Sequence, residues 1–321
     1  MTLIRSKISA TGSYLPQKIL SNAELAKTVE TSDDWITDRT GIKQRCIAAE
    51  GELTSDIATR AVEKVLENSG LKAEEIDLII LATTTPDLTF PASATTVQAN
   101  IGANNAFAFD IQAVCSGFVY AISTADNFIK SGQVKNAIVI GADILSRIVD
   151  WQDRNTCVLF GDGAGAVLLQ ATTEENCGII AADLHSDGSL KDLLKTSGGT
   201  SFNQKSGFIE MAGKEVFKHA VEKMSKSVLS VLEKARMSTQ DIDFLIPHQA
   251  NSRILNAVAA RLELPPEKVI ITVQNHANTS AASIPLALDF ANSHNVIKKG
   301  DVVVLEALGG GLTWGSVVLR W

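Results

Sequence analysis

The sequence lacks a long apolar run and an apolar leader segment. Its uncharged, apolar-rich stretch at 111–125 includes Gln112 and Ser116 and is shorter than the roughly 20 residues that a membrane-spanning helix needs. The first residues, MTLIRSKISATGSYLP, carry early charges and no apolar core of a secretory signal. We therefore expect a cytoplasmic protein that does not act in a membrane.

Cysteine and basic residues are also scarce. The four cysteines, Cys46, Cys115, Cys157 and Cys177, form no Cys-x-x-Cys pair. A zinc site or a disulfide framework is therefore not indicated, and any functional cysteine would act as a thiolate in a reducing cytoplasm. The 29 Lys and Arg residues are outnumbered by 36 Asp and Glu residues, which gives a net charge of −7. This charge argues against a general nucleic-acid binder, although local basic patches remain open.

The two halves of the 321-residue chain resemble each other. Residues 62–81 and 228–247 both show an amphipathic helix, a polar turn and a buried strand, which are units of layered α/β folds. Aligned without a gap, the two segments share these residues: Val62/Val228, Val65/Val231, Leu66/Leu232, Glu67/Glu233, Ile76/Ile242, Asp77/Asp243 and Ile80/Ile246.

Strand-like segments repeat in the same way. The apolar run 137–141 is matched by 302–306, and the run 164–169 is matched by 315–319, each of the last two after a Gly-rich turn. Such continuous apolar runs are typical of strands covered by helices on both faces. We infer an internally duplicated α/β protein with halves 1–172 and 173–321, divided in the polar stretch 171–177. The alternative is that α/β proteins reuse these patterns by chance.

Cys115 is the candidate nucleophile. The run 106–110 predicts a strand, and an apolar stripe from Phe118 to Ile129 predicts a helix that begins near Ser116. A cysteine at such a junction faces a helix N-terminus, which favours a thiolate and offers backbone N–H groups to an oxyanion. The alternative is a buried, inert cysteine, because free cysteines are among the most buried residues.

Two further candidates could assist a thiolate. His248 follows the strand-like run DFLIP, and strand ends carry the sites of many α/β proteins, although a histidine there is often structural. Asn278 lies in a polar loop before an apolar helix at 280–290, and His276 competes for the same role. The glycines at 309–311 permit close backbone approach to a ligand, or simply a tight hairpin.

Six motifs, in order along the chain, resemble those of the β-ketoacyl-acyl-carrier-protein synthase III family, the initiating condensing enzymes of bacterial type II fatty-acid synthesis. The resemblance implies a thiolase-like fold, which is an internally duplicated α-β-α-β-α arrangement with mixed sheets. The motifs are SDDWITDRTGI (32–42), AVCSGF (113–118), FGDGAGAVLL (160–169), PHQAN (247–251), HANTSAAS (276–283) and EALGGGLTWGS (306–316).

The resemblance also implies catalytic roles. Cys115 would accept the acyl group, and His248 and Asn278 would complete a Cys–His–Asn triad. The N–H of Gly310 would join that of Cys115 in an oxyanion hole. No cofactor or metal is implied, because acyl-CoA and malonyl-acyl carrier protein are substrates.

Binding roles follow from the same motifs. Trp35, Arg39, Arg154 and Asn251 would form the coenzyme A pocket, with Thr31, Gly213 and Phe217 nearby. Phe90 would reach across a homodimer into the partner's acyl pocket, and Lys218 and Arg253 would dock the carrier protein. Three positions depart from the common family pattern: Ser116, the single basic residue in the pair Ala260–Arg261, and Ala277.

The implied reaction is a decarboxylative Claisen condensation of a short acyl-CoA, with acetyl-CoA as the first candidate. Three alternatives stay open at this point. The first is a related condensing enzyme of a polyketide or quinolone pathway, and the second is a cysteine-dependent thioester hydrolase. The third is a dimeric binding protein without activity.

Overall fold

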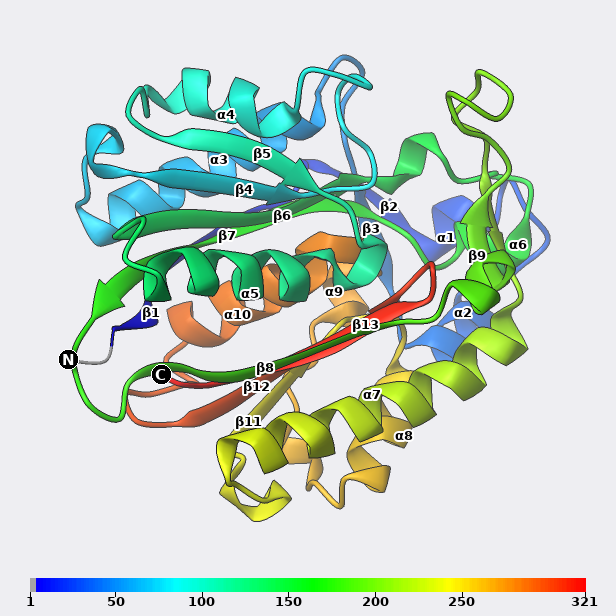
Figure 1. Ribbon diagram of the computed structural model, residues 1–321. Helices are drawn as coiled ribbons and strands as arrows, with labels where there is room; N and C mark the ends of the chain where they lie inside the picture. The colour runs from blue at the N-terminus through cyan, green and yellow to red at the C-terminus, as the bar shows by residue number, and fades with distance from the viewer. Residues whose placement is uncertain (1–3) are drawn as a thin grey trace.

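Two β-sheets lie between three layers of helices in the computed structural model, which describes residues 4–321 (Figure 1). The first sheet has the order β1-β7-β6-β4-β5, with β1 (Arg5–Tyr14), β4 (Leu78–Ala82), β5 (Phe107–Ile111), β6 (Asn136–Ile144) and β7 (Asp162–Thr172). The second sheet has the order β11-β12-β13-β8, with β8 (Gly178–Ser186), β11 (Phe244–Pro247), β12 (Val302–Gly309) and β13 (Thr313–Arg320).

The helices form one central and two outer layers. The central layer holds α5 (Gly117–Lys130) and α10 (Ser283–Ser293), between the two sheets. One outer layer holds α3 (Thr54–Ser69) and α4 (Ser93–Ile101), and the other holds α7 (Gly213–Ala235) and α8 (Ser252–Arg261).

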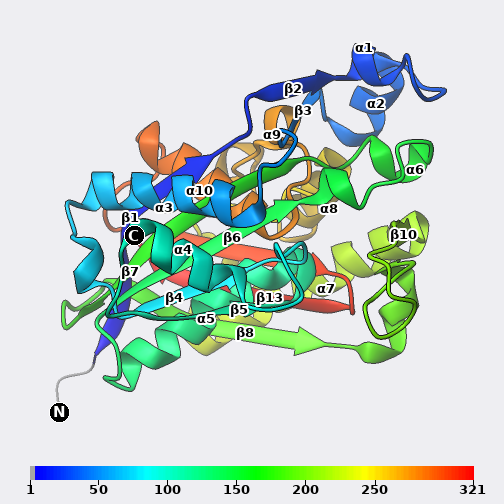
Figure 2. The same ribbon diagram turned by 90° about the horizontal axis from the view of Figure 1, so that it is seen from above.

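Shorter elements gather at one end of the layers (Figure 2). Together they enclose a separate buried apolar cluster, which includes Leu25, Ile36 and Val273. They are β2 (Lys18–Ser21), α1 (Asn22–Leu25), α2 (Asp33–Thr40), β3 (Gln44–Ile47), α6 (Arg154–Cys157), β9 (Leu194–Thr196), β10 (Ile209–Met211) and α9 (Val273–His276).

The predicted duplication and the layered α/β fold class are confirmed by the sheet topology. In the first sheet β7 pairs antiparallel with both β1 and β6, and β6 pairs in parallel with β4. In the second sheet β13 pairs antiparallel with both β8 and β12, and β12 pairs in parallel with β11. The parallel partner β5 of the first sheet is reduced in the second to a single parallel bridge between Leu245 and Val269. The predicted helix–turn–strand repeat is α3 to β4 and α7 to β11, each joined through a short 3-10 helix. Because β7 ends at Thr172 and β8 begins at Gly178, we propose to keep the boundary of the halves at 172.

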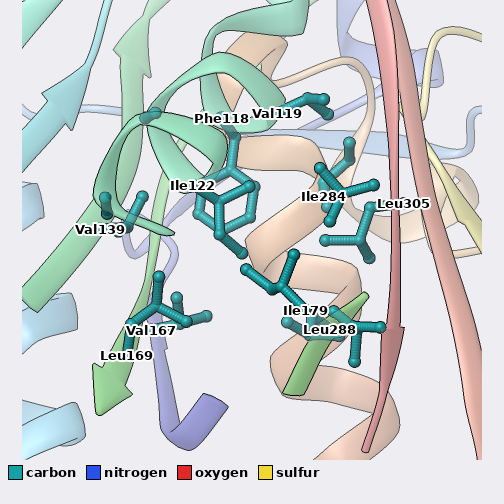
Figure 3. Packing of buried hydrophobic residues seen from close by; sticks show 14 of the residues in the cluster. Phe118, Val119, Ile122, Val139, Val167, Leu169, Ile179, Ile284, Leu288 and Leu305 are labelled. Atoms are coloured by element: carbon teal, nitrogen blue, oxygen red, sulfur yellow. The ribbon is translucent and has the colours of Figure 1, made fainter. Parts of the chain in front are cut away.

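The central helices are buried because each of them packs between the sheets. Phe118 and Ile122 of α5 and Ile284 and Leu288 of α10 meet strand residues such as Leu305 in one apolar cluster (Figure 3). The strands 78–82 and 302–309 are buried along their whole length, as their continuous apolar runs predict. The outer helices close two further clusters on the outer faces of the sheets.

One close approach requires glycine. A Cβ atom on Gly141 of β6 would lie 2.2 Å from the carbonyl oxygen of Ala281. No side chain fits at that distance, because the contact is with backbone. Gly141 therefore lets the turn before α10 lie directly on the first sheet, at the end where the short elements gather.

Glu306 is an acidic residue inside the otherwise apolar strand β12. Its carboxyl group is fully buried, and neither oxygen has a hydrogen-bond partner within residues 4–321. Its sheet neighbours are Pro247 and Ser316, and the latter is hydrogen-bonded to Ser227 of α7. Burial raises the pKa of Glu306 to about 8, so the group is mainly protonated in the folded protein at neutral pH.

We expect Glu306 to make the protein less stable as the pH rises. An unfolded chain releases this proton near pH 4.5, whereas the folded chain holds it to about pH 8, so the folded state binds more protons in between. Its contribution should therefore fall by roughly 1.4 kcal/mol per pH unit between about pH 5 and 8. Glu306→Gln should remove that slope in denaturant unfolding measured at several pH values. Parallel pH profiles for the two proteins would contradict this account.

Candidate active site

Cys115 lies in a 3-10 turn, Val114–Ser116, between β5 and the first residue of α5. Val114 has a φ of 50° and Ser280, which opens the corresponding turn before α10, has a φ of 51°. The two halves therefore use the same strained turn, and it is Ala281 that takes the place of the cysteine in the second half. The strained turn is therefore a feature of the duplicated fold, and the cysteine is what distinguishes the turn of the first half.

The Cys115 thiol is more deeply buried than its position at a strand-to-helix junction predicts. Cys115 is 5% exposed, and burial raises the pKa of its thiol to about 12, with the nearby Ser280 hydroxyl lowering it and Asp143 raising it further. The expectation of a lowered thiol pKa at the helix N-terminus is therefore wrong for the unliganded protein. Loss of hydration outweighs the attraction of the helix end.

Cys115 stands where two cavities meet. One cavity of about 430 Å³ is lined by Cys115, Gly310 and residues of the loops around them, including Thr84, Gln112 and Leu194. The other, of about 100 Å³, is lined by Cys115 together with predicted residues from the second half, namely His248, Asn278, Asn251, Gly213 and Phe217. A single residue thus borders two spaces that could hold different groups.

His248 follows β11 and is buried, with Nδ1 2.7 Å from the Ser283 hydroxyl. Burial lowers the pKa of His248 to about 3, so the ring is neutral and donates or accepts through Nε2 without carrying charge. The competing His276 lines neither of the two cavities, and burial lowers its pKa to about 4.

Asn278 is held by its own backbone beside the second cavity. Its N–H donates to Leu159 O at 2.9 Å, and its carbonyl accepts from Gly161 N–H at 3.0 Å. Its side-chain Oδ1 accepts from Ser280 N–H at 2.9 Å, so the amide NH₂ is the end left to donate. The preceding Ala277, one of the three departures from the family pattern, has a φ of 58°, a conformation that glycine adopts with less strain.

The glycine run forms the tight turn between β12 and β13 and also lies against the nucleophile. A Cβ on Gly309 would lie 2.7 Å from Cys115 N, and one on Gly310 would lie 2.8 Å from Leu194 O. The hairpin is therefore confirmed, and the close approach that the structure shows is to the backbone of the chain itself. Figure 1 shows this turn and the start of α5 at the same end of the layers.

Asp143, which was not among the predicted residues, is a buried carboxyl group beside the site. It accepts hydrogen bonds from Thr84 N at 2.7 Å, Thr83 Oγ1 at 3.1 Å and Ala281 N at 3.2 Å. Burial raises its pKa to about 6, although the hydrogen bonds from the Thr84 and Ala281 N–H groups lower it. The only signal was one acidic residue that interrupts the apolar run 137–145. Asp143 fastens the turn of the second half to a loop of the first.

Three of the predicted coenzyme A residues, Trp35, Arg39 and Arg154, lie on the short helices α2 and α6 at this end. The Arg39 and Arg154 guanidinium carbons lie 4.8 and 4.9 Å from the ring centroid of Trp35, within the range of cation–π attraction. Arg154 also donates to Glu30 O at 3.0 Å. The Thr31 hydroxyl is buried without a hydrogen-bond partner in the part of the chain that the structure describes. Asn251 caps α8 by accepting from Ile254 N–H.

Seven predicted residues line neither of the two cavities: Thr31, Trp35, Arg39, Arg154, Phe90, Lys218 and Arg253. Phe90 is 83% exposed, in a loop between β4 and α4. Lys218 on α7 and Arg253 on α8 have exposed side chains on the outer helical layer. Among residues 4–321, no group of three or more His, Cys, Asp or Glu side chains could hold a metal ion. The same residues include no helix that is long and apolar enough to cross a membrane.

The layered duplicated fold around a buried cysteine defines a thiolase-like enzyme. Models of 3-oxoacyl-[acyl-carrier-protein] synthase III match residues 109–188, and those of its C-terminal part match 232–321. A β-ketoacyl-[acyl-carrier-protein] synthase III from Ehrlichia canis is 60% identical over 316 residues, which cover 98% of this chain and 99% of the relative. The chain belongs to the β-ketoacyl-[acyl-carrier-protein] synthase III family, and is therefore a condensing acyltransferase of fatty-acid synthesis.

Solved structures agree with this assignment. The 3-oxoacyl-[acyl-carrier-protein] synthase III of Aquifex aeolicus has a TM-score of 0.94 at 50% identity and covers 98% of this chain and 100% of its own. A priming β-ketosynthase of the R1128 polyketide pathway has a TM-score of 0.93 at 31% identity, with 98% and 96% covered. The fold is therefore shared by condensing enzymes of more than one pathway.

The raised thiol pKa predicts slow, pH-dependent alkylation of Cys115. In the free enzyme we expect the rate of its reaction with iodoacetamide to rise about tenfold per pH unit from pH 7 to 9. These pH values lie well below the pKa of about 12, where the fraction of reactive thiolate increases tenfold with each pH unit. Mass spectrometry of the peptide that contains Cys115 measures this rate. A plateau at or below pH 8 would show that the helix N-terminus outweighs burial.

A methyl group on the glycine turn should displace the nucleophile. Gly309→Ala places a Cβ 2.7 Å from Cys115 N and 2.9 Å from Ala113 O, so we expect acylation of Cys115 to fall by roughly 100-fold or more. Gly188→Ala is the matched control, because a Cβ there meets nothing within 4 Å. Acylation by acyl-CoA is followed by intact mass. Equal acylation of the two variants would refute a positioning role for the turn.

Proposed function

We propose that this enzyme condenses a short acyl-CoA, with acetyl-CoA as the first candidate, with malonyl-acyl carrier protein through an acyl-Cys115 intermediate. The observation that carries the proposal is the position of Cys115 at the meeting point of two cavities, one of which also contains His248 and Asn278. The larger cavity suits the acyl chain, and the narrower one suits the thioester arm of either substrate.

In the first stage the Cys115 sulfur attacks the acyl thioester. The bond from the acyl carbon to coenzyme A sulfur breaks, and the thiol proton leaves with coenzyme A. The N–H groups of Cys115 and Gly310 would hold the oxyanion of the tetrahedral intermediate, which is the type of stabilisation worth roughly 3–4 kcal/mol per donor. The close packing of the glycine turn on Cys115 supports this role.

In the second stage malonyl-acyl carrier protein loses CO₂ and leaves an enolate. Nε2–H of neutral His248 and the amide of Asn278 would donate to the enolate oxygen, and neither group has to accept a proton. The enolate carbon attacks the acyl-Cys115, and the thiolate that leaves takes up one proton. The complete reaction therefore consumes one proton, because the negatively charged malonyl carboxylate leaves as neutral CO₂.

Coenzyme A would bind with its adenine on Trp35, beside Arg39 and Arg154, and its arm would run past Thr31, Gly213, Phe217 and Asn251. Aromatic stacking and guanidinium–phosphate contacts suit a nucleotide. No cofactor takes part in this scheme. A reducing cytoplasm would keep the Cys115 thiol free for acylation.

We propose a homodimer formed along β5. This strand is the edge of the first sheet, and Phe107 on it is 40% exposed; an exposed apolar edge favours pairing with another chain. Phe90, 83% exposed, would close the acyl pocket of the partner. Lys218 and Arg253 would attract the acidic carrier protein, with the reduced basic character at Arg261 weakening that contact.

A second candidate reaction is the priming step of a polyketide pathway. The structural similarity to the priming β-ketosynthase of the R1128 pathway favours it. The two candidates differ in the acyl group and carrier that are accepted rather than in the chemistry at Cys115. Rates with a series of acyl-CoA chain lengths and with different carrier proteins would separate them.

Incubation with acyl-CoA should add the mass of one acyl group to Cys115. Cys115→Ala should remain unmodified and form no condensation product with malonyl-acyl carrier protein. Intact and peptide mass spectrometry measure both effects. An unmodified Cys115 with every acyl-CoA tested would refute the proposal, and acylation followed only by hydrolysis would favour the thioester hydrolase.

A further inference from the structure

The first residue of α10 contacts the histidine of the site. Ser283 Oγ lies 2.7 Å from His248 Nδ1, and both residues are buried. The same oxygen accepts a hydrogen bond of 3.3 Å from Gln249 N–H. A neutral imidazole carries one proton, so either Ser283 donates to Nδ1 or Nδ1–H donates to Ser283.

The hydrogen bonds around Ser283 favour one of these arrangements. If Nδ1–H donated, Ser283 Oγ would accept from both His248 and Gln249, and its own hydroxyl proton would need another acceptor. Within residues 4–321 Ser283 Oγ has no third partner. A buried donor left unpaired costs free energy, whereas donation from Ser283 to Nδ1 satisfies all of these groups.

The duplication shows that the fold itself does not need this polar pair. The corresponding contact in the first half joins Gly117, the first residue of α5, to Ala82, the last residue of β4. A Cβ on Gly117 would lie 3.1 Å from the Ala82 Cβ. A helix start can thus pack on a strand end with small apolar groups. A buried polar pair at the same place in the second half points to a function.

We propose that the Ser283 hydroxyl donates to Nδ1 of His248 and thereby holds the ring as the tautomer with its proton on Nε2. In that tautomer Nε2–H faces the cavity as a donor. In the other tautomer Nε2 would present a lone pair to the thioester oxygen and repel the enolate. Ser283 is a positioning residue in this scheme, and its role in the condensation rests on the proposed function.

Nuclear magnetic resonance of histidine labelled with ¹⁵N tests the tautomer directly in the free enzyme. The chain has five histidines, and a His248→Gln variant assigns the signal of interest. We expect the wild type to show the proton on Nε2 and a hydrogen-bonded, unprotonated Nδ1. A proton on Nδ1 would overturn the proposal, whether or not any substituted protein folds.

Ser283→Ala tests the consequence. We expect its His248 to shift toward the Nδ1–H tautomer and condensation to slow by roughly tenfold or more, while acylation of Cys115 by acyl-CoA changes only a few-fold. Ser283→Thr, which keeps the hydroxyl, should restore the tautomer and most of the rate. Ser225→Ala is the control, because Ser225 is a buried serine of α7 that donates to Val221 O.

Different outcomes would overturn the role of Ser283 and the proposed function. An unchanged His248 signal and unchanged condensation in Ser283→Ala would overturn the role of Ser283 while leaving the proposed function intact. A wild-type enzyme with the Nε2–H tautomer but no condensation product would refute the proposed function and leave the hydrogen bond as found.

Discussion

The fold depends on one shared layer, in which α5 and α10 cover the inner faces of both sheets at once. Neither half buries its inner sheet face with its own helix alone, because α5 contacts β4 and β6 of the first half and β12 and β13 of the second, while α10 contacts β1 and β7 of the first half and β11 of the second. Both helices begin at the same end of the sheets, after matching turns with positive φ at Val114 and Ser280. The packing that stabilises the protein therefore also brings a cysteine of one half beside a histidine of the other.

Burial then sets the electrostatic character of the site. The same loss of hydration that raises the pKa of Cys115 to about 12 lowers that of His248 to about 3, so both groups are neutral before substrate binds. A neutral site suits chemistry in which charge develops on a substrate oxygen and is met by fixed donors. Asp143 is also buried, but its ring of hydrogen-bond donors compensates for part of that cost.

Much of the architecture could be predicted from the sequence, because periodicity reports local burial. The repeat of 62–81 at 228–247 anticipated α3 with β4 and α7 with β11, and Cys115 was placed at a strand-to-helix junction. The thiol pKa was predicted in the wrong direction, since the depth of a residue in a packed core depends on elements far away in sequence. Asp143 and Ser283 were missed for the same reason, because their partners Ala281 and His248 lie 138 and 35 residues away.

The sequence by itself determined the duplicated α/β plan, the order of the motifs and the family, because each of these depends on the order and spacing of residues along the chain. Only the tertiary structure decided which groups meet: Gly309 against the backbone of Cys115, Ser283 on His248, and two cavities that both border Cys115. The physical reason is that these contacts join segments that lie far apart in the sequence, and most of them join the two halves. Their distances depend on how the central helices pack between two sheets, and residue spacing carries no information about that packing.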